Sequence, residues 1–202
     1  MKGLKVQELI SSGVYATVYF FVVFIATMIL RFTVPTFNSL LIPALSALLS
    51  GVVYLMVVNR VPKFGAITIV GSIMGVFFLV FGYFPLAFLP SVVFPLLADI
   101  VQNKTKLADK VKLFTSYTLF SFGLTGPILP LWFMKEAYVE SLLKRGKDMS
   151  YVNSVFEPIT TGTFFISMGL TVIFSIIGLM IGQKIYDKHF AKKTKTGSKA
   201  WN

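Results

Sequence analysis

Five long, apolar stretches of the chain carry no Asp, Glu, Lys or Arg. They are residues 9–30, 32–59, 64–98, 113–134 and 158–183. A helix needs about 20 predominantly apolar residues to cross the ~30 Å hydrocarbon core of a bilayer. The third stretch is too long for one crossing, and the sequence "GYFP" at 82–85 is typical of a turn at a membrane surface. The pattern therefore predicts six spanning helices, at about 11–31, 38–58, 64–82, 85–102, 112–134 and 158–186.

Composition agrees with this pattern. Of the 202 residues, 55% are hydrophobic and 13% are charged, whereas about a quarter of the residues in a soluble domain are charged. The sequence has no cysteine and one histidine, His189, which excludes disulfides, thiol nucleophiles and Cys/His zinc sites. We therefore expect an all-α integral membrane protein that carries no cofactor and no metal.

The distribution of basic residues predicts the orientation. With six spans, 14 of the 19 Lys and Arg residues fall on the side that holds both termini. The positive-inside rule then makes both termini cytoplasmic, in a multi-pass protein of the plasma membrane. The net charge of +11 is thus a signal of topology and of attraction to anionic lipid headgroups rather than of nucleic-acid binding.

No linker divides the chain. Residues 1–190 are expected to form one six-helix membrane domain, and residues 191–202 a flexible, basic cytoplasmic tail. The first helix follows Lys2 and Lys5, as a secretion signal would, but no small-residue cleavage site follows it. We therefore expect this helix to be retained.

Small residues four positions apart allow the backbones of two membrane helices to approach closely. Such pairs are Ser12 with Ala16 in the first helix and Gly71 with Gly75 in the third. Two interpretations remain open. The pairs pack the helices of this chain against one another, or they form a surface that docks a second membrane subunit.

Prolines and glycines interrupt the fourth and fifth predicted helices. Pro85, Pro90 and Pro95 recur every five residues, and Gly126–Pro127 is followed by Pro130. Interior prolines bend a helix and free carbonyl groups, which membrane proteins tolerate where protein, water or a ligand satisfies them. One hypothesis is simple kinking for packing.

The other hypothesis is an outward-facing pocket with aromatic walls and a few polar groups, as is common in small-molecule sites. Its candidate residues are three stacking aromatics, a hydrogen-bonding amide and an acidic anchor: Trp132, Tyr83, Phe84, Asn38 and Glu136. For Trp132 alone, a role as an interfacial anchor is the commoner explanation.

The segment 135–157 is the longest connection between predicted spans. Its sequence "EAYVESLLKR" has helical spacing, and Gly146 is a suitable helix end. It is interpreted either as a lid over the pocket or as a solvated connector.

Two charged residues near span ends leave alternatives open. Asp99 either reaches the cytoplasmic surface beside Lys104 or Lys106, or takes part in proton or ion coupling. Arg31 either extends to the outer headgroups or meets an anionic ligand.

Motifs for enzymatic chemistry are missing from the sequence. It contains no G-x-x-x-x-G-K-[ST] phosphate loop, no H-E-x-x-H and no G-x-S-x-G. The chain is therefore not expected to be an enzyme, which leaves transport, binding or assembly.

Five segments in chain order carry a family resemblance: "VQELISSGVYATVYFFV", "NRVPKFGAITIVGSIMG", "PLLADIV", "GPILPLWFMKEAY" and "GLMIGQKIYDKHF". Over nearly its whole length the chain resembles the MptD-like group of S components of energy-coupling factor (ECF) transporters. The resemblance implies a six-helix subunit that captures a vitamin or related micronutrient outside the cell. It also implies that the subunit assembles with a membrane coupling protein and two cytoplasmic ATPases. The substrate site implied by the resemblance lies in the outer half, near helices 4 to 6 and the first outer loop.

The resemblance implies docking through helix 1, for which Ser12 and Ala16 are the matching positions, with Gly13 beside them. Together with the spacing motif Gly71 and Gly75, these residues are expected to form the docking surface. The resemblance identifies no cargo. Two alternatives are a self-sufficient small transporter that uses Asp99 for proton coupling, and an accessory membrane protein without a transport role.

Overall fold

The structure is a computed structural model that describes residues 4–190, all of whose regular elements are helical. The predicted tail at 191–202 lies outside the described residues. The nine α-helices are α1 (Val6–Thr33), α2 (Asn38–Arg60), α3 (Ala66–Val80), α4 (Phe88–Lys104), α5 (Asp109–Phe122), α6 (Leu129–Phe133), α7 (Lys135–Lys144), α8 (Met149–Phe156) and α9 (Thr161–His189). Three 3₁₀ turns join them: η1 (Pro35–Phe37), η2 (Pro85–Ala87) and η3 (Gly123–Thr125). The all-α prediction is confirmed.

Within the described residues, four helical segments are long and apolar enough to cross a membrane. They are Val6–Thr33, Pro35–Arg60, Pro85–Lys104 and Thr161–His189. The helix α3 is apolar but has only 15 residues, about 22 Å at 1.5 Å per residue. The predicted fifth span, 112–134, is not one helix, because it ends as an α-helix at Phe122 and continues as η3 and α6.

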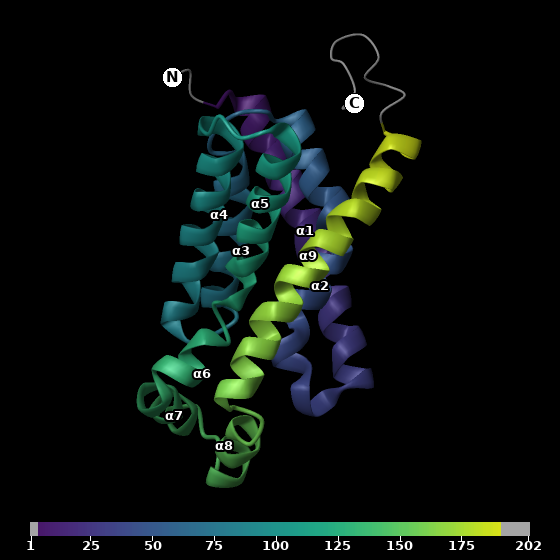
Figure 1. The fold of residues 1–202 in the computed structure, drawn as a ribbon. Helices are drawn as coiled ribbons and strands as arrows, with labels where there is room; N and C mark the ends of the chain where they lie inside the picture. The colour runs from purple at the N-terminus through teal and green to yellow at the C-terminus, as the bar shows by residue number, and fades with distance from the viewer. Residues whose placement is uncertain (1–3, 191–202) are drawn as a thin grey trace.

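The helices form an elongated bundle with two distinct ends (Figure 1). The start of α1 and the end of α9 lie together at one end, which we call the terminal end, and the short helices α6, α7 and α8 gather at the opposite, distal end. The long helix α9 crosses the bundle diagonally and makes its most extensive contact with α2.

Glycines bring α2 and α9 into backbone contact. A Cβ atom added to Gly178 would overlap the carbonyl oxygen of Ala47, and one added to Gly51 would overlap that of Gly178. A Cβ on Gly182 would lie 2.6 Å from the carbonyl carbon of Gly51. Close approach of backbones through small residues is how helices associate where lipid provides no hydrophobic drive.

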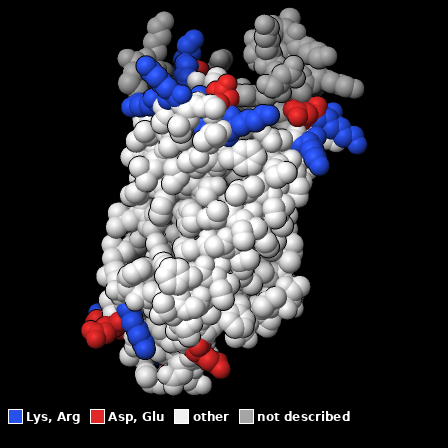
Figure 2. Space-filling model, in the orientation of Figure 1, with Lys and Arg blue, Asp and Glu red and all other residues white. Residues whose placement is uncertain are grey.

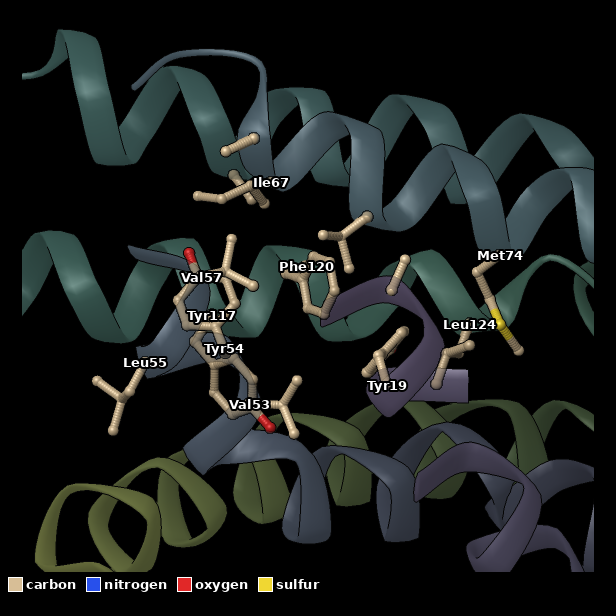
Figure 3. Close-up of a cluster of buried hydrophobic side chains, with 14 of the residues drawn as sticks. Tyr19, Val53, Tyr54, Leu55, Val57, Ile67, Met74, Tyr117, Phe120 and Leu124 are labelled. Atoms are coloured by element: carbon tan, nitrogen blue, oxygen red, sulfur yellow. The ribbon is translucent and has the colours of Figure 1, made fainter. Parts of the chain in front are cut away.

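The centre of the bundle combines aromatic packing with buried hydroxyl groups (Figure 3). The rings of Tyr54 and Tyr117 lie 4.9 Å apart, and Phe120 packs against Tyr54 at 5.3 Å. The Tyr54 hydroxyl pairs with that of Ser116, which donates to the carbonyl oxygen of Ala98 at 2.7 Å. These hydrogen bonds join α2, α4 and α5.

The sides of the bundle are apolar, and charge is confined to the ends. Large hydrophobic side chains such as Phe21, Ile25, Phe165 and Ile173 are exposed along α1 and α9. Figure 2 shows a broad uncharged band on the face it displays, with Lys, Arg, Asp and Glu gathered at both ends. Such a surface is typical of a protein whose sides face lipid.

Candidate functional site

The segment 135–157 folds into two short helices at the distal end. The predicted helix at "EAYVESLLKR" is confirmed as α7, and Gly146 ends it with a φ of 76°. The Lys147 N–H donates to the carbonyl oxygen of Leu142 at 3.1 Å, which satisfies a terminal carbonyl. Asp148 begins α8, where its side chain accepts from the Tyr151 N–H at 2.8 Å.

These helices cover a second apolar cluster, separate from the central core. Its fully buried members come from α2 and the α6 region, and its partly buried members come from α6 to α9: Leu40, Ile128, Leu131, Trp132, Tyr138, Val155, Phe156, Ile159 and Met168. The segment is thus packed against the bundle, and we call it the distal cap (residues 135–157). Its action as a lid stays a prediction.

The predicted substrate-binding residues lie on several elements and make different contacts. Trp132 donates from Nε1 to the carbonyl oxygen of Thr160 at 2.9 Å, and Phe84 packs against Tyr138 at 5.7 Å. Tyr83 is 44% exposed and contacts Phe78 instead. Burial raises the pKa of the Tyr83 and Tyr138 phenols, so both stay neutral near pH 7.

The two polar candidates lie on different elements. Glu136 is exposed on α7, and Asn38 is half-buried at the start of α2, where its Oδ1 accepts from the Ser39 hydroxyl at 2.8 Å. None of the five residues lines either of the two hollows described below. Their role in binding stays a prediction.

The chain is packed tightly where α5 ends and passes the start of α4. A Cβ added to Gly126 would overlap the carbonyl oxygen of Ala87. The Ser91 hydroxyl donates to the carbonyl oxygen of Gly123 at 2.8 Å and so satisfies a group that the break leaves free. The cavity beside Gly123 and Pro95 measures about 10 Å³, room for about one water. These contacts favour the packing alternative for Gly126 and Pro95, and the pocket with aromatic walls stays a prediction.

A larger hollow lies elsewhere at the distal end, between the first distal loop and the start of α9. Its volume is about 220 Å³, and the residues lining it come from η1, α2 and α9: Val34, Phe37, Leu40, Leu41, Thr163, Ile166 and Ser167. We call it the distal hollow. The surface that it presents is wholly apolar.

The hydroxyl groups beside the distal hollow are already engaged. Ser167 donates to the carbonyl oxygen of Leu40 at 2.6 Å and thereby joins α9 to α2. Thr163 Oγ1 donates to the carbonyl oxygen of Pro158 at 2.7 Å and accepts from the Thr160 N–H at 2.9 Å. Sequence analysis singled out none of these residues, because apolar residues that line a hollow look like those that face lipid. The capping pair Thr160 and Thr163 was the available signal for where α9 begins.

The four predicted docking residues are buried in packing between this chain's own helices. Ser12 is 0% and Ala16 3% exposed. A Cβ on Gly71 would overlap the Pro95 ring, and one on Gly75 would lie 2.9 Å from the Phe88 ring. They offer no free surface to a second subunit, because their small size admits α2, α3 and α4 instead. The expectation of a docking surface at these positions is corrected accordingly.

Comparison with known families decides the broad class. The model of a family described as a hypothetical bacterial integral membrane protein, Trep_Strep, matches residues 6–192. The chain belongs to the Trep_Strep family. No curated protein and no solved structure matches it. As a Trep_Strep member with several long apolar helices, it is a multi-pass membrane protein.

Asp99 has a structural role in this Trep_Strep chain. It is 0% exposed, and its Oδ2 accepts from the Gly65 N–H (2.7 Å), the Thr68 N–H (3.0 Å) and the Thr68 hydroxyl (2.7 Å). Its Oδ1 accepts from Asn103 Nδ2 at 2.7 Å. Asp99 on α4 therefore caps the N-terminus of α3, whose first amides have no partner within their own helix. Lys104 contacts the ring of Phe64 at 4.1 Å.

Among the described residues, no three His, Cys, Asp or Glu side chains lie close enough to hold a metal ion. Arg31 is exposed in the last turn of α1, at the same end as the distal hollow.

Proposed function

We propose that the chain is the substrate-capture subunit of an ATP-driven, ECF-type importer of a vitamin or related micronutrient. It takes up a small molecule at the distal end and delivers it inward. The observation that carries this proposal is the distal hollow of about 220 Å³ between the first distal loop and α9. The resemblance to S components implies a substrate site in the outer half, near helices 4 to 6 and the first outer loop. The hollow shares with that expectation the first distal loop and the sixth predicted helix, α9.

The charge distribution supports an orientation with the distal end outside the cell. At the terminal end, the basic residues within the described chain outnumber the acids: Lys5, Arg60, Lys63, Lys104, Lys106, Lys110, Lys112, Lys184 and Lys188. At the distal end, basic and acidic residues of the cap are interspersed. By the positive-inside rule the terminal end faces the cytoplasm of a plasma-membrane protein.

Energy for import then comes from partner subunits. The sequence contains no phosphate-binding loop, so a coupling protein and two ATPases supply ATP hydrolysis. Because the four small residues first considered for docking are buried, the outward face of α1 is the proposed contact for the coupling protein. That face exposes Ile10, Val14 and Phe21, and Gly13 has open space where a side chain would lie.

Reconstituted transport tests the proposal. Proteoliposomes hold the chain alone, or the chain with the coupling protein and ATPases of the same bacterium, and uptake is followed across a panel of radiolabelled vitamins. We expect uptake that needs all partners and ATP, and that stops when the ATPases carry an inactivated phosphate loop. Ion-gradient-driven uptake by the chain alone, lost in Asp99→Asn, would instead establish a self-sufficient transporter. Partner binding without uptake or a retained ligand would indicate an accessory protein.

A pair of variants locates the substrate site. Leu41→Trp fills the distal hollow, whereas Leu49→Trp places the same side chain at an exposed position two turns along α2. We expect Leu41→Trp to weaken substrate binding at least tenfold and Leu49→Trp to leave it unchanged. Trp132→Ala examines the site expected from the sequence: a tenfold loss there, with Leu41→Trp unaffected, would move the site to the α6 region.

A further inference from the structure

The distal hollow has a chemistry that restricts its ligand, if the proposed capture function holds. No Asp, Glu, Lys, Arg or His lines it, and the surface that it presents is apolar. Its two hydroxyl-bearing residues, Thr163 and Ser167, direct their protons to the carbonyl oxygens of Pro158 and Leu40. A polar ligand group that packs against this surface would give up hydration there without gaining a hydrogen-bond partner.

The volume of the distal hollow limits the size of the ligand group that it can hold. An apolar cavity of about 150 Å³ stays dry and binds benzene. The distal hollow is open on one side, where Val34, Phe37 and Ile166 are exposed, and its volume of about 220 Å³ is room for a ring system somewhat larger than benzene. Water in the hollow meets no polar group on the surface that the hollow presents.

We propose that the distal hollow binds an uncharged, apolar ring system of one or two rings, either as a whole ligand or as the ring portion of the imported molecule. A charged group on that molecule remains outside the hollow. The exposed side chains of Val34 and Phe37 form its side toward the first distal loop, so the ring enters past η1. The inference deepens the proposed function by naming the ligand class of its site.

Two matched probes test the ligand class on the full chain in phospholipid nanodiscs. Tritiated naphthalene and tritiated 2-naphthoate have the same ring system and differ in charge. Equilibrium dialysis against protein-containing and empty nanodiscs separates binding to the protein from partition into lipid. The wild type and Leu49→Trp are expected to bind naphthalene saturably at one site, and Leu41→Trp at least tenfold more weakly. Binding of 2-naphthoate is expected to be at least tenfold weaker than that of naphthalene.

Three outcomes overturn the inference. One is equal binding of the two probes, and another is naphthalene binding that Leu41→Trp does not reduce. The third is a phospholipid that co-purifies at one per protein and is lost only in Leu41→Trp, because the hollow would then hold an acyl chain. Uptake that still requires the ATPase partners, together with failed naphthalene binding, would reject the ligand class and leave the proposed function intact. Naphthalene binding without any partner-dependent uptake would reject the proposed function and leave the ligand class intact.

Discussion

Removing the Asp99 carboxylate is expected to destabilise the protein through the N-terminus of α3. In Asp99→Ala, the Gly65 and Thr68 amides and the Thr68 hydroxyl lose their shared acceptor. A buried donor without a partner costs about 1–3 kcal/mol. Because Gly65 and Thr68 are only half-buried, we take the lower figure for each of the three donors, which gives about 3 kcal/mol. For a chain of this length that corresponds to a fall in Tm of about 6–12 °C.

The assay is thermal unfolding of the purified protein in one detergent, followed by circular dichroism. Asp109→Ala is the matched control, because Asp109 is an exposed acid in the first turn of α5 that pairs with Lys112 at 3.1 Å. Its Tm is expected to shift by about 2 °C at most, since exposed ion pairs contribute little. Asp99→Asn keeps one acceptor oxygen and is expected to fall between the two. The reasoning is refuted if Asp99→Ala unfolds at the same temperature as Asp109→Ala.

Three further predictions concern packing, the α2–α9 contact and pH. Gly126→Ala is expected to lower Tm, because the added Cβ would overlap the Ala87 carbonyl oxygen. Gly169 has open space around it, so Gly169→Ala is expected to leave Tm unchanged or raise it. Equal Tm values for the two variants would contradict the tight packing at Gly126. Ser167→Ala removes the hydrogen bond to the Leu40 carbonyl oxygen and is expected to lower the free energy of unfolding by about 1 kcal/mol. That loss corresponds to a fall in Tm of about 2–4 °C, measured against Ser154→Ala as the control, since Ser154 is exposed. The hydrogen bond from Lys144 lowers the pKa of Glu140. This pair therefore stabilises α7 at pH values above the ordinary carboxyl pKa, and the stabilisation is lost as pH falls through the lowered pKa of the folded state. A peptide of residues 134–147 should lose helicity on acidification more steeply than its Glu140→Gln counterpart, and identical curves would count against the pair.

Helix type and several boundaries followed from the sequence because they depend on local chemistry. The charge-free stretches predicted the long helices α1, α2, α4 and α9, and "GYFP" predicted the turn at Gly82, which has a φ of 73°. The end of α7 at Gly146 is another example, since a residue with positive φ is the usual helix terminus.

The fifth predicted span shows where local rules were insufficient. A Gly-Pro step is compatible with a kinked helix or with a broken one. The break occurs here because Gly126 packs against the carbonyl of Ala87 and Ser91 satisfies the carbonyl of Gly123. Both partners lie more than 30 residues away, so the sequence around Gly126 does not encode the choice by itself.

Burial was equally hard to predict for the small residues. Gly71 and Gly75 have the spacing of a helix-docking motif, and the spacing is the same whether the partner is another subunit or the chain's own α4. Asp99 has the same ambiguity, because its partners Gly65 and Thr68 precede it by 34 and 31 residues. Residue type and spacing show that a helix face can pack closely against another backbone. Which helix packs there depends on the tertiary structure.

The two ends of the bundle are held by different kinds of contact. At the terminal end, Asp99 accepts four hydrogen bonds, and Lys63 pairs with Glu8 at 2.8 Å to join the loop before α3 to α1. The distal cap instead rests mainly on the apolar cluster beneath α6 to α8. Displacing the cap would uncover this apolar cluster, which contains no charged group. Opening the terminal end would strand a buried carboxylate and the amides that it caps. A ligand exchanged at the distal end therefore needs no rearrangement of the Asp99 cap.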